Sequence, residues 1–294
     1  MDNKIMLAEE RKNFHRALLD KGILSIDGNG IISNADKSNG PSRLIAKGIF
    51  NRIMMGLHAD GMVMEKVAGQ TSGAKFETVV KEYLESTFPR LQHLRPGKWE
   101  ILQLGNKSKI KSSSFSQYEH LNYLNELAKA NAQLAAALGN DYTVAPDVVV
   151  YRHLCEDSEI NAPFPVVDKS VANFCDLRKQ NGGKPILHAS VSAKWTMRSD
   201  RAQNSRTEAL NLIRNRKGRL PHIMVVTGEP TPSRLASLAL GTGDIDCVYH
   251  FALYELLETA DEDGINEDSR ELLHTLVAGK RLKDISDMPL DLSV

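Results

Sequence analysis

The chain has few cysteines and no long apolar run, and each absence excludes a class of protein. Its 294 residues include three cysteines, Cys155, Cys175 and Cys247, whose odd number and wide spacing argue against a disulfide framework or a zinc site. No apolar stretch approaches the roughly 18 residues that cross a bilayer. The segment 1–19 is amphipathic and contains acidic residues, unlike a signal peptide. We therefore expect a cytoplasmic protein with free thiols and no membrane partner.

The chain also lacks net charge, with 37 basic and 37 acidic residues, which by itself does not favour a nucleic-acid partner. The charges are unevenly distributed, however. The segment 257–272 is acidic and is predicted to face solvent. The segment 198–219 has two acidic residues, Asp200 and Glu208, against seven basic ones, and such a patch can hold phosphates. Its basic residues are Arg198, Arg201, Arg206, Arg214, Arg216, Lys217 and Arg219.

Hydrophobic periodicity predicts an α/β fold in one domain, residues 1–294, because neither repeats nor a dividing linker are present. A polar loop is expected at 26–41. Helices are expected at 1–19, 42–57, 73–88, 118–138 and 200–217. Strands are expected at 99–105, 146–152, 186–195, 222–228 and 247–253, with the first three forming a meander.

Three residues on these elements have the chemistry of a metal-dependent nuclease. Asp147 opens a β-branched strand, Lys194 ends another, and Glu208 lies about two turns along a helix. Phosphodiester hydrolysis needs a divalent metal, and Mg²⁺ prefers carboxylates, waters and substrate oxygens. Asp147 and Glu208 would supply the carboxylates, while Lys194 would orient the attacking water and offset charge on the phosphorus.

The local pattern is compatible with such a meeting, but three residues alone are a weak signal. Strand alternation places Ser190, Ser192 and Lys194 on one face, away from the apolar side. An aspartate at a strand start and a solvated lysine are both common in globular proteins. The choice between a nuclease site and ordinary surface residues therefore depends on the rest of the sequence.

Three longer stretches resemble the NgoMIV-like restriction endonucleases, which belong to the CCGG group of type II enzymes in the PD-(D/E)XK superfamily. The stretches are 33–39 (SNADKSN), 68–77 (AGQTSGAKFE) and 188–257, and the similarity runs almost from end to end. The spacing agrees as well, with 46 residues between Asp147 and Lys194 and 13 between Lys194 and Glu208. The resemblance implies a central mixed β-sheet flanked by α-helices.

The resemblance also implies a role for each matching residue. Asp147 and Glu208 match metal-binding carboxylates, Lys194 the catalytic lysine, and Glu77 an additional acid from an early helix. Ser192 stands where related nucleases usually have an acidic residue. Without the resemblance, Glu77 would read as an ordinary surface charge on a helix.

Base recognition is expected from the tetrad 198–201. Arginine forks suit guanine O6 and N7, and a carboxylate can accept from cytosine N4, so Arg198, Asp200 and Arg201 are chemically matched to a core of C and G. The plain alternative makes Asp200 a helix N-cap with solvated arginines beside it. In the resembled family the tetrad reads the central CCGG. Further matches contact the flanking G and C or approach the minor groove, namely Asp36, Ser38, Arg234 and Gln70.

The implied activity is Mg²⁺-dependent cleavage of double-stranded DNA at GCCGGC after the first G, which gives 5′ overhangs and 5′-phosphates. By analogy we expect a homo-oligomer, a dimer of dimers, and a cognate methyltransferase as genetic partner without a bound complex. Another CCGG-containing site remains an alternative. So do a repair or junction nuclease, which the tetrad argues against, and a DNA-binding module without catalysis, which the intact acids and lysine argue against.

Overall fold

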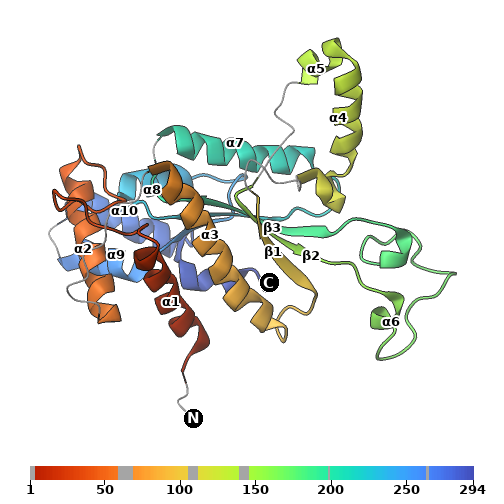
Figure 1. Cartoon of the computed structure of the whole chain (residues 1–294), viewed down its shortest axis with the longest axis horizontal. Helices are drawn as coiled ribbons and strands as arrows, with labels where there is room; N and C mark the ends of the chain where they lie inside the picture. Colours follow the sequence, from red (N-terminus) through yellow and green to blue (C-terminus); the bar gives the residue numbers. More distant parts are fainter. Residues whose placement is uncertain (1–3, 59–68, 105–111, 139–145, 198, 263–264) are drawn as a thin grey trace.

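A six-stranded mixed sheet forms the centre of the computed structural model, which describes residues 4–58, 69–104, 112–138, 146–197, 199–262 and 265–294 (Figure 1). The strands lie side by side in chain order. The first three, β1 to β3, are antiparallel, and β3 to β6 are parallel. Their bounds are β1 Trp99–Gln103, β2 Val148–Arg152, β3 Ile186–Lys194, β4 His222–Thr227, β5 Cys247–His250 and β6 Leu282–Asp284.

Both faces of the sheet are covered, which explains the long apolar runs of its inner strands. In β2, Val148, Val149 and Val150 are fully buried. The seven inner residues of β3 are buried too, including Ser190 and Ser192. The serine face of β3 is therefore covered by other elements and does not meet solvent.

The helices lie on both sides of this sheet. In Figure 1, α7 runs along one side, and α1 and α3 lie on the other. The helix α3 packs across β1, β2 and β3, and α1 packs on α3. The α-helices are α1 Met6–Asp20, α2 Gly40–Leu57, α3 Gly69–Thr87, α4 His120–Ala130, α5 Ala132–Leu138, α6 Asp157–Ile160, α7 Ser199–Asn215, α8 Pro232–Ala239, α9 Leu253–Glu262, α10 Glu267–Ala278 and α11 Met288–Asp291. Short 3₁₀ turns are η1 Phe88–Leu91, η2 Ser112–Ser114, η3 Ser116–Tyr118, η4 Lys179–Asn181 and η5 Ile285–Asp287.

The predicted meander of three strands is confirmed, one strand was not expected, and two other predictions need correction. β6 was not expected, because three residues, LKD, give no readable alternation. The expected helix 118–138 is divided into α4 and α5, since Asn131 is extended and its side chain caps α5 by accepting from the N–H groups of Gln133 and Leu134, both at 3.0 Å. The last expected strand ends at His250, and α9 begins at Leu253.

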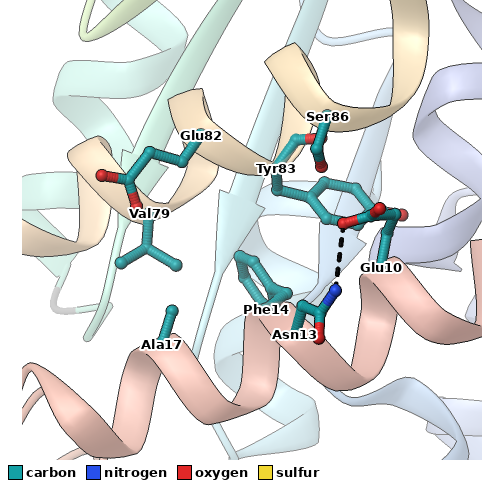
Figure 2. A pocket seen from close by; sticks show the side chains of 8 residues that line it. All are labelled: Glu10, Asn13, Phe14, Ala17, Val79, Glu82, Tyr83 and Ser86. Atoms are coloured by element: carbon teal, nitrogen blue, oxygen red, sulfur yellow. Dashed lines mark hydrogen bonds between the residues drawn. The ribbon is translucent and has the colours of Figure 1, made fainter. Parts of the chain in front are cut away.

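A cavity of about 220 Å³ lies between α1 and α3 (Figure 2). Phe14, Ala17, Val79 and Tyr83 contribute apolar surface to it, and Glu10, Asn13, Glu82 and Ser86 complete its lining. None of the sequence-predicted site residues lines this cavity. It is a gap in helix packing, and the candidate site must be sought at the end of the central strands.

The structure also describes the three cysteines and the apolar character of the helices. All three cysteines are free thiols, of which Cys247 is buried. No helix in the described part of the chain has both the length and the apolar character needed to span a membrane.

Candidate active site

The structure brings Asp147 and Lys194 into direct contact. Asp147 immediately precedes β2, and Lys194 is the last residue of the neighbouring antiparallel strand β3. Both residues therefore lie at the same end of these two inner strands. The Lys194 ammonium donates to Asp147 Oδ2 at 2.6 Å, and both side chains are largely buried. A partly buried ion pair keeps the two charges together more firmly than a solvent-exposed one.

Asp147 is also fixed by the backbone and side chains of β3. The N–H of Ala193 donates to Asp147 Oδ2 at 2.8 Å, and the Ser192 hydroxyl lies 3.4 Å from the same oxygen. A second contact of that hydroxyl, 3.3 Å from Ser205 Oγ, joins β3 to α7. Ser192 therefore supports the aspartate and links the strand to the helix.

Glu208 faces this pair from α7. The helix buries Ala202, Ser205, Ala209 and Leu212, a spacing of three and four residues that marks the face against the sheet. Glu208 lies beside this face, one turn after Ser205. Burial raises the pKa of the Glu208 carboxyl, the nearby Lys194 charge lowers it, and Asp147 raises it further. Glu208 is thus close enough to Asp147 and Lys194 to interact with their charges.

Glu77 approaches the same cluster from α3. Burial raises the pKa of its carboxyl, Asp147 raises it further, and Lys194 acts in the opposite direction. The side-chain amide of Gln103, the last residue of β1, donates to Glu77 Oε2 at 3.0 Å. Gln103 is in turn held by the Thr78 hydroxyl at 2.8 Å. The residue before β2, the last residue of β3, and the helices α3 and α7 therefore contribute three acids and a lysine that interact with one another through Asp147 and Lys194.

The donor set fits a hard divalent cation. Carboxylate oxygens are the protein ligands Mg²⁺ prefers, and it commonly takes only one or two of them beside water and substrate oxygens. Burial and mutual repulsion raise the pKa of two of the three acids, and a cation would relieve that repulsion. Within the described residues, no group of three or more His, Cys, Asp or Glu side chains is close enough to hold an ion by itself. Asp147 and Glu208, the pair predicted from the sequence, would match the one or two carboxylates that Mg²⁺ commonly takes.

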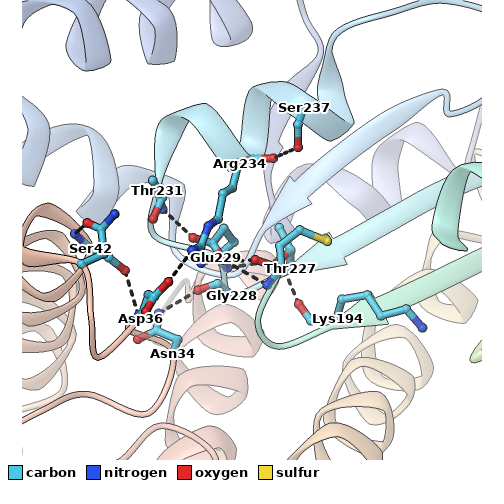
Figure 3. A network of polar contacts seen from close by, with 12 residues as sticks. Asn34, Asp36, Ser42, Lys194, Thr227, Gly228, Glu229, Thr231, Arg234 and Ser237 are labelled. Atoms are coloured by element: carbon cyan, nitrogen blue, oxygen red, sulfur yellow. Dashed lines mark hydrogen bonds and ion pairs between the residues drawn. The ribbon is translucent and has the colours of Figure 1, made fainter. Parts of the chain in front are cut away.

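A second cluster joins three residues predicted to contact the outer base pair. The Arg234 guanidinium of α8 forms an ion pair with Asp36, and the Ser38 hydroxyl donates to Asp36 Oδ1 at 2.7 Å. The hydrogen bonds from Ser38, followed by that from Arg234, lower the pKa of Asp36 to about 2. The loop before α2 and the start of α8 are therefore joined by a network of polar contacts (Figure 3).

Comparison with known proteins identifies the family. The model of the NgoMIV restriction enzyme family matches residues 14–294. The chain belongs to the NgoMIV restriction enzyme family. It is 53% identical over 289 residues to the type II restriction enzyme NgoMIV of Neisseria gonorrhoeae, an alignment that covers 98% of this chain and 99% of that protein. The protein is accordingly a type II restriction endonuclease, a site-specific DNA endonuclease.

This chain was also compared with solved structures. It is similar to one chain of the complex of the restriction endonuclease PspGI with substrate DNA. The alignment covers 99% of this chain and 92% of that one, with 14% identity and a TM-score of 0.31. A score this low supports no argument about function. The mixed sheet with flanking helices stands on the strand pairing described above.

Four residues predicted to contact bases in this NgoMIV-family protein have side chains outside the described part of the structure. Arg198 lies outside the described residues. The backbone of Asp200 and Arg201 forms the first turn of α7, which begins at Ser199, so Asp200 lies inside the helix and is not its cap. Gln70 likewise lies in the first turn of α3.

The basic patch predicted to hold phosphates is smaller than its sequence suggests. Arg206 forms an ion pair with Asp244 and donates to the carbonyl oxygens of Ser237 and Leu238 at 3.0 and 3.1 Å. Its guanidinium ties α7 to the end of α8. In the acidic segment 257–272, the side chains of Glu258 and Glu262 face solvent, as predicted. They also lie 3.5 and 2.9 Å from Arg52 of α2.

Three contributors to the NgoMIV-family site escaped prediction. Gln103 holds Glu77, Ser205 contacts Ser192, and the fully buried Glu229 accepts backbone hydrogen bonds beside Arg234. Local sequence gives little sign of these roles, because glutamine and serine are common at strand ends and in helices. Glu229 is the exception, because an acidic residue directly after the apolar strand HIMVVTG is unusual and could have marked it as a candidate.

Proposed function

We propose that this restriction endonuclease hydrolyses double-stranded DNA at GCCGGC, after the first G of each strand, with Mg²⁺ as its metal. The observation that carries the catalytic part is the contact of Asp147 with Lys194 at the ends of β2 and β3, with Glu208 and Glu77 each close enough for Asp147 and Lys194 to influence its pKa. The sequence similarity to the NgoMIV enzyme supports the choice of DNA site.

Asp147 and Glu208 would hold the metal ion. Restriction endonucleases of this kind generally depend on a divalent metal, and bound Mg²⁺ supplies charge neutralisation at the phosphate and a more acidic water. The raised pKa of Glu208 supports this assignment, because a cation stabilises the charged carboxylate that burial disfavours.

Lys194 would place a positive charge beside the scissile phosphate and orient the attacking water. The water oxygen forms a bond to phosphorus in line with the bond to O3′, which breaks, leaving a 3′-hydroxyl and a 5′-phosphate. Asp147 holds the lysine in place through the 2.6 Å ion pair. Glu77, fixed by Gln103, would accept or hold a proton near the site, and Ser192 would keep Asp147 in position.

Recognition is assigned to two groups of residues. Arg198, Asp200 and Arg201 would read the central CCGG from the major groove, since guanidinium forks match guanine and a carboxylate matches the cytosine amino group. Asp36, Ser38 and Arg234 would read the outer G and C. Their mutual hydrogen bonds support this, because a pre-formed polar surface loses less conformational entropy when it binds bases. Gln70 would approach the minor groove.

A palindromic site calls for a two-fold symmetric protein, since both half-sites present the same contacts. We propose a homo-oligomer built as a dimer of dimers from one-domain chains of 294 residues. The enzyme would work in the cytoplasm beside a cognate DNA methyltransferase that protects the host site and forms no stable complex with it.

The test is cleavage of plasmids carrying two, one or no GCCGGC sites by the purified protein with Mg²⁺, with EDTA as control, followed by mapping of the ends. We expect cutting only at GCCGGC, with four-base 5′ overhangs, and faster cutting of the two-site plasmid. Cutting at a different CCGG-containing site would overturn the outer-pair assignment. Tight, specific binding without metal-dependent cutting would overturn the catalytic one.

A further inference from the structure

A buried acid links the catalytic strand to the start of α8. Glu229 lies in the loop between β4 and α8, and its side chain is 1% exposed. Its Oε2 accepts from the backbone N–H of Met197 at 3.0 Å, and its Oε1 accepts from that of Thr231 at 3.1 Å. Met197 follows the catalytic strand β3, whereas Thr231 is the N-cap of α8. One carboxylate therefore satisfies backbone donors from two elements that meet here.

Arg234 lies against the same carboxylate. Its Nη1 is 3.7 Å from Glu229 Oε2, while its Nη2 pairs with Asp36 (Figure 3). The guanidinium is thus held between an acid that is fully enclosed and one that is more exposed. Because Glu229 cannot move without breaking backbone hydrogen bonds, it limits the positions that the guanidinium can take.

The loop that carries Glu229 is itself fixed to β3. The Thr227 hydroxyl donates to the carbonyl oxygen of Lys194 at 2.8 Å and accepts from the Glu229 N–H at 3.1 Å. The Asn34 side chain donates to the Gly228 carbonyl at 2.7 Å. A Cβ at Gly228 would lie 2.5 Å from the Trp195 ring, so only glycine allows this close approach. The loop, the catalytic strand and the segment leading to Asp36 form one connected unit.

We propose that Glu229 is a positioning residue that holds Arg234 at a fixed place relative to the catalytic strand and thereby sets the enzyme's preference for the outer base pair. The inference rests on the proposed function, in which Arg234 reads that pair. Glu229 does not contact DNA in this scheme. It acts through Arg234, and a carboxylate is required because both of its oxygens accept from N–H donors.

The amide in Glu229→Gln is the same size but replaces one acceptor oxygen with a donor. In either orientation that donor faces a backbone N–H, of Met197 or of Thr231, and the lost negative charge weakens the support of the Arg234 guanidinium. Glu229→Asp keeps the charge but shortens the side chain by one methylene, and it cannot reach both backbone donors. A purely structural role of Glu229 would lower stability in both variants and leave the choice of base pair unchanged.

The experiment measures kcat/KM with Mg²⁺ on four duplexes that differ only in the outer pair of the palindrome NCCGGN. The readout is the ratio of kcat/KM for GCCGGC to that for the next best site. We expect Glu229→Gln to lower this ratio about tenfold, because the neutral amide removes the ion pair that holds the Arg234 guanidinium at 3.7 Å. Glu229→Asp should lower it by a smaller factor, and it decides the matter should Glu229→Gln fail to fold.

Two controls separate positioning from stability. Asp284, another fully buried acid, pairs with Arg11 at 2.9 Å and accepts from a backbone N–H, but it lies on β6, two strands from β4. Asp284→Asn should lower Tm and leave the ratio unchanged. In an Arg234→Ala background, Glu229→Gln should cause no further fall of the ratio, because its effect passes through Arg234.

Different results would contradict the proposed function and the positioning role of Glu229. A wild-type protein that cuts none of the four duplexes contradicts the proposed function. A wild-type protein that prefers GCCGGC, together with Glu229 variants that keep the full ratio while their Tm falls, contradicts only the positioning role. An additional loss of preference from Glu229→Gln in the Arg234→Ala background also contradicts it.

Discussion

The proposed catalytic cluster (Asp147, Lys194, Glu208 and Glu77) and the Arg234 cluster (Asp36, Ser38 and Arg234) differ in how well their acids are stabilised as charged groups. At the edge of β3, Lys194 is shared by several acids, and burial and repulsion raise the pKa of Glu77 and Glu208. At the start of α8, Asp36 is satisfied by Ser38 and Arg234, and its pKa is lowered to about 2. The first cluster has a surplus of negative charge, whereas the hydrogen bonds of the second already stabilise its exposed acid.

This difference indicates what each cluster requires from outside. Acids whose charge is disfavoured by burial gain most from a bound cation, so the surplus at the catalytic cluster is consistent with a metal-dependent reaction. Acids already stabilised by hydrogen bonds need no ion and provide a fixed shape that can match base edges. The pKa directions of Glu77, Glu208 and Asp36 thus agree with the roles proposed for these three residues.

The largest expected effect is from Lys194→Ala or Asp147→Ala. Either change removes half of the ion pair at the centre of the catalytic cluster, and we expect the cleavage rate to fall by about 10³-fold or more while specific DNA binding remains. The matched control is Lys283→Ala, since Lys283 also pairs with an aspartate, Asp291, at 2.6 Å but lies on β6. Retained turnover in the Lys194 variant would remove that residue from the site.

His188, at the other end of β3, provides a buried titratable group to set beside the acids of the catalytic cluster. No acid is among the groups that shift its pKa. Burial lowers its pKa to about 4, although its ring contacts the Leu292 carbonyl at 2.7 Å. Unfolding restores a pKa near 6.5, so the unfolded state gains a proton first as the pH falls from about 6.5 to 4. The free energy of unfolding should drop by about 3 kcal/mol over this range.

Denaturant unfolding at a series of pH values measures the His188 effect. His188→Gln removes the titrating group and should flatten that part of the profile. His250, whose pKa burial also lowers to about 4, remains in the variant with His15 and His222, whose pKa values burial lowers too, and these histidines contribute a residual slope. An unchanged profile in His188→Gln would show that the proton is taken up elsewhere.

The next effect compares two arginines of α7. Arg201→Ala should weaken binding to the specific site by about 1–3 kcal/mol more than binding to a scrambled duplex, the cost of a lost bidentate base contact. Arg206→Ala should lower Tm without changing this difference, because Arg206 is committed to Asp244 inside the protein. Binding titrations on the two duplexes measure both. An equal loss on every sequence would make Arg201 a phosphate contact.

The smallest expected effect tests the surplus charge itself. The raised pKa of Glu208 means that its charged form costs stability once the pH exceeds that pKa, so the neutral Glu208→Gln should be more stable at neutral pH without metal. We expect Tm to rise by about 2–4 °C, the shift for about 1 kcal/mol in a large domain. Added Mg²⁺ should stabilise the wild type and not the variant.

An exposed acid provides the control for the Glu208 prediction. Glu82 forms a surface pair with Lys21 at 2.6 Å, and Glu82→Gln should change Tm little with or without Mg²⁺. A lower Tm in Glu208→Gln without metal would mean that the Glu208 charge is already compensated, and it would remove the contrast between the two clusters.

Strongly apolar segments of the sequence predicted five of the six strands that the structure describes. The run VVVYR and the longer ILHASVSAK could be recognised as strands because inner strands of a covered sheet are almost wholly apolar. Weak segments failed for an equally physical reason. LKD is too short to show alternation and forms β6 only because β5 is available to pair with it, while the break between α4 and α5 depends on one capping side chain, Asn131.

The sequence by itself determined the chemistry of the protein. Asp147, Lys194 and Glu208, with the long similar stretch around them, indicate the family and the reaction because residue type and spacing are properties of the chain. Only the tertiary structure decided how these residues are neutralised and supported. Contacts such as Gln103 with Glu77, or Glu229 with Met197 and Thr231, join positions that are far apart or shaped by backbone geometry. Local patterns cannot encode them, because each depends on how several elements pack together.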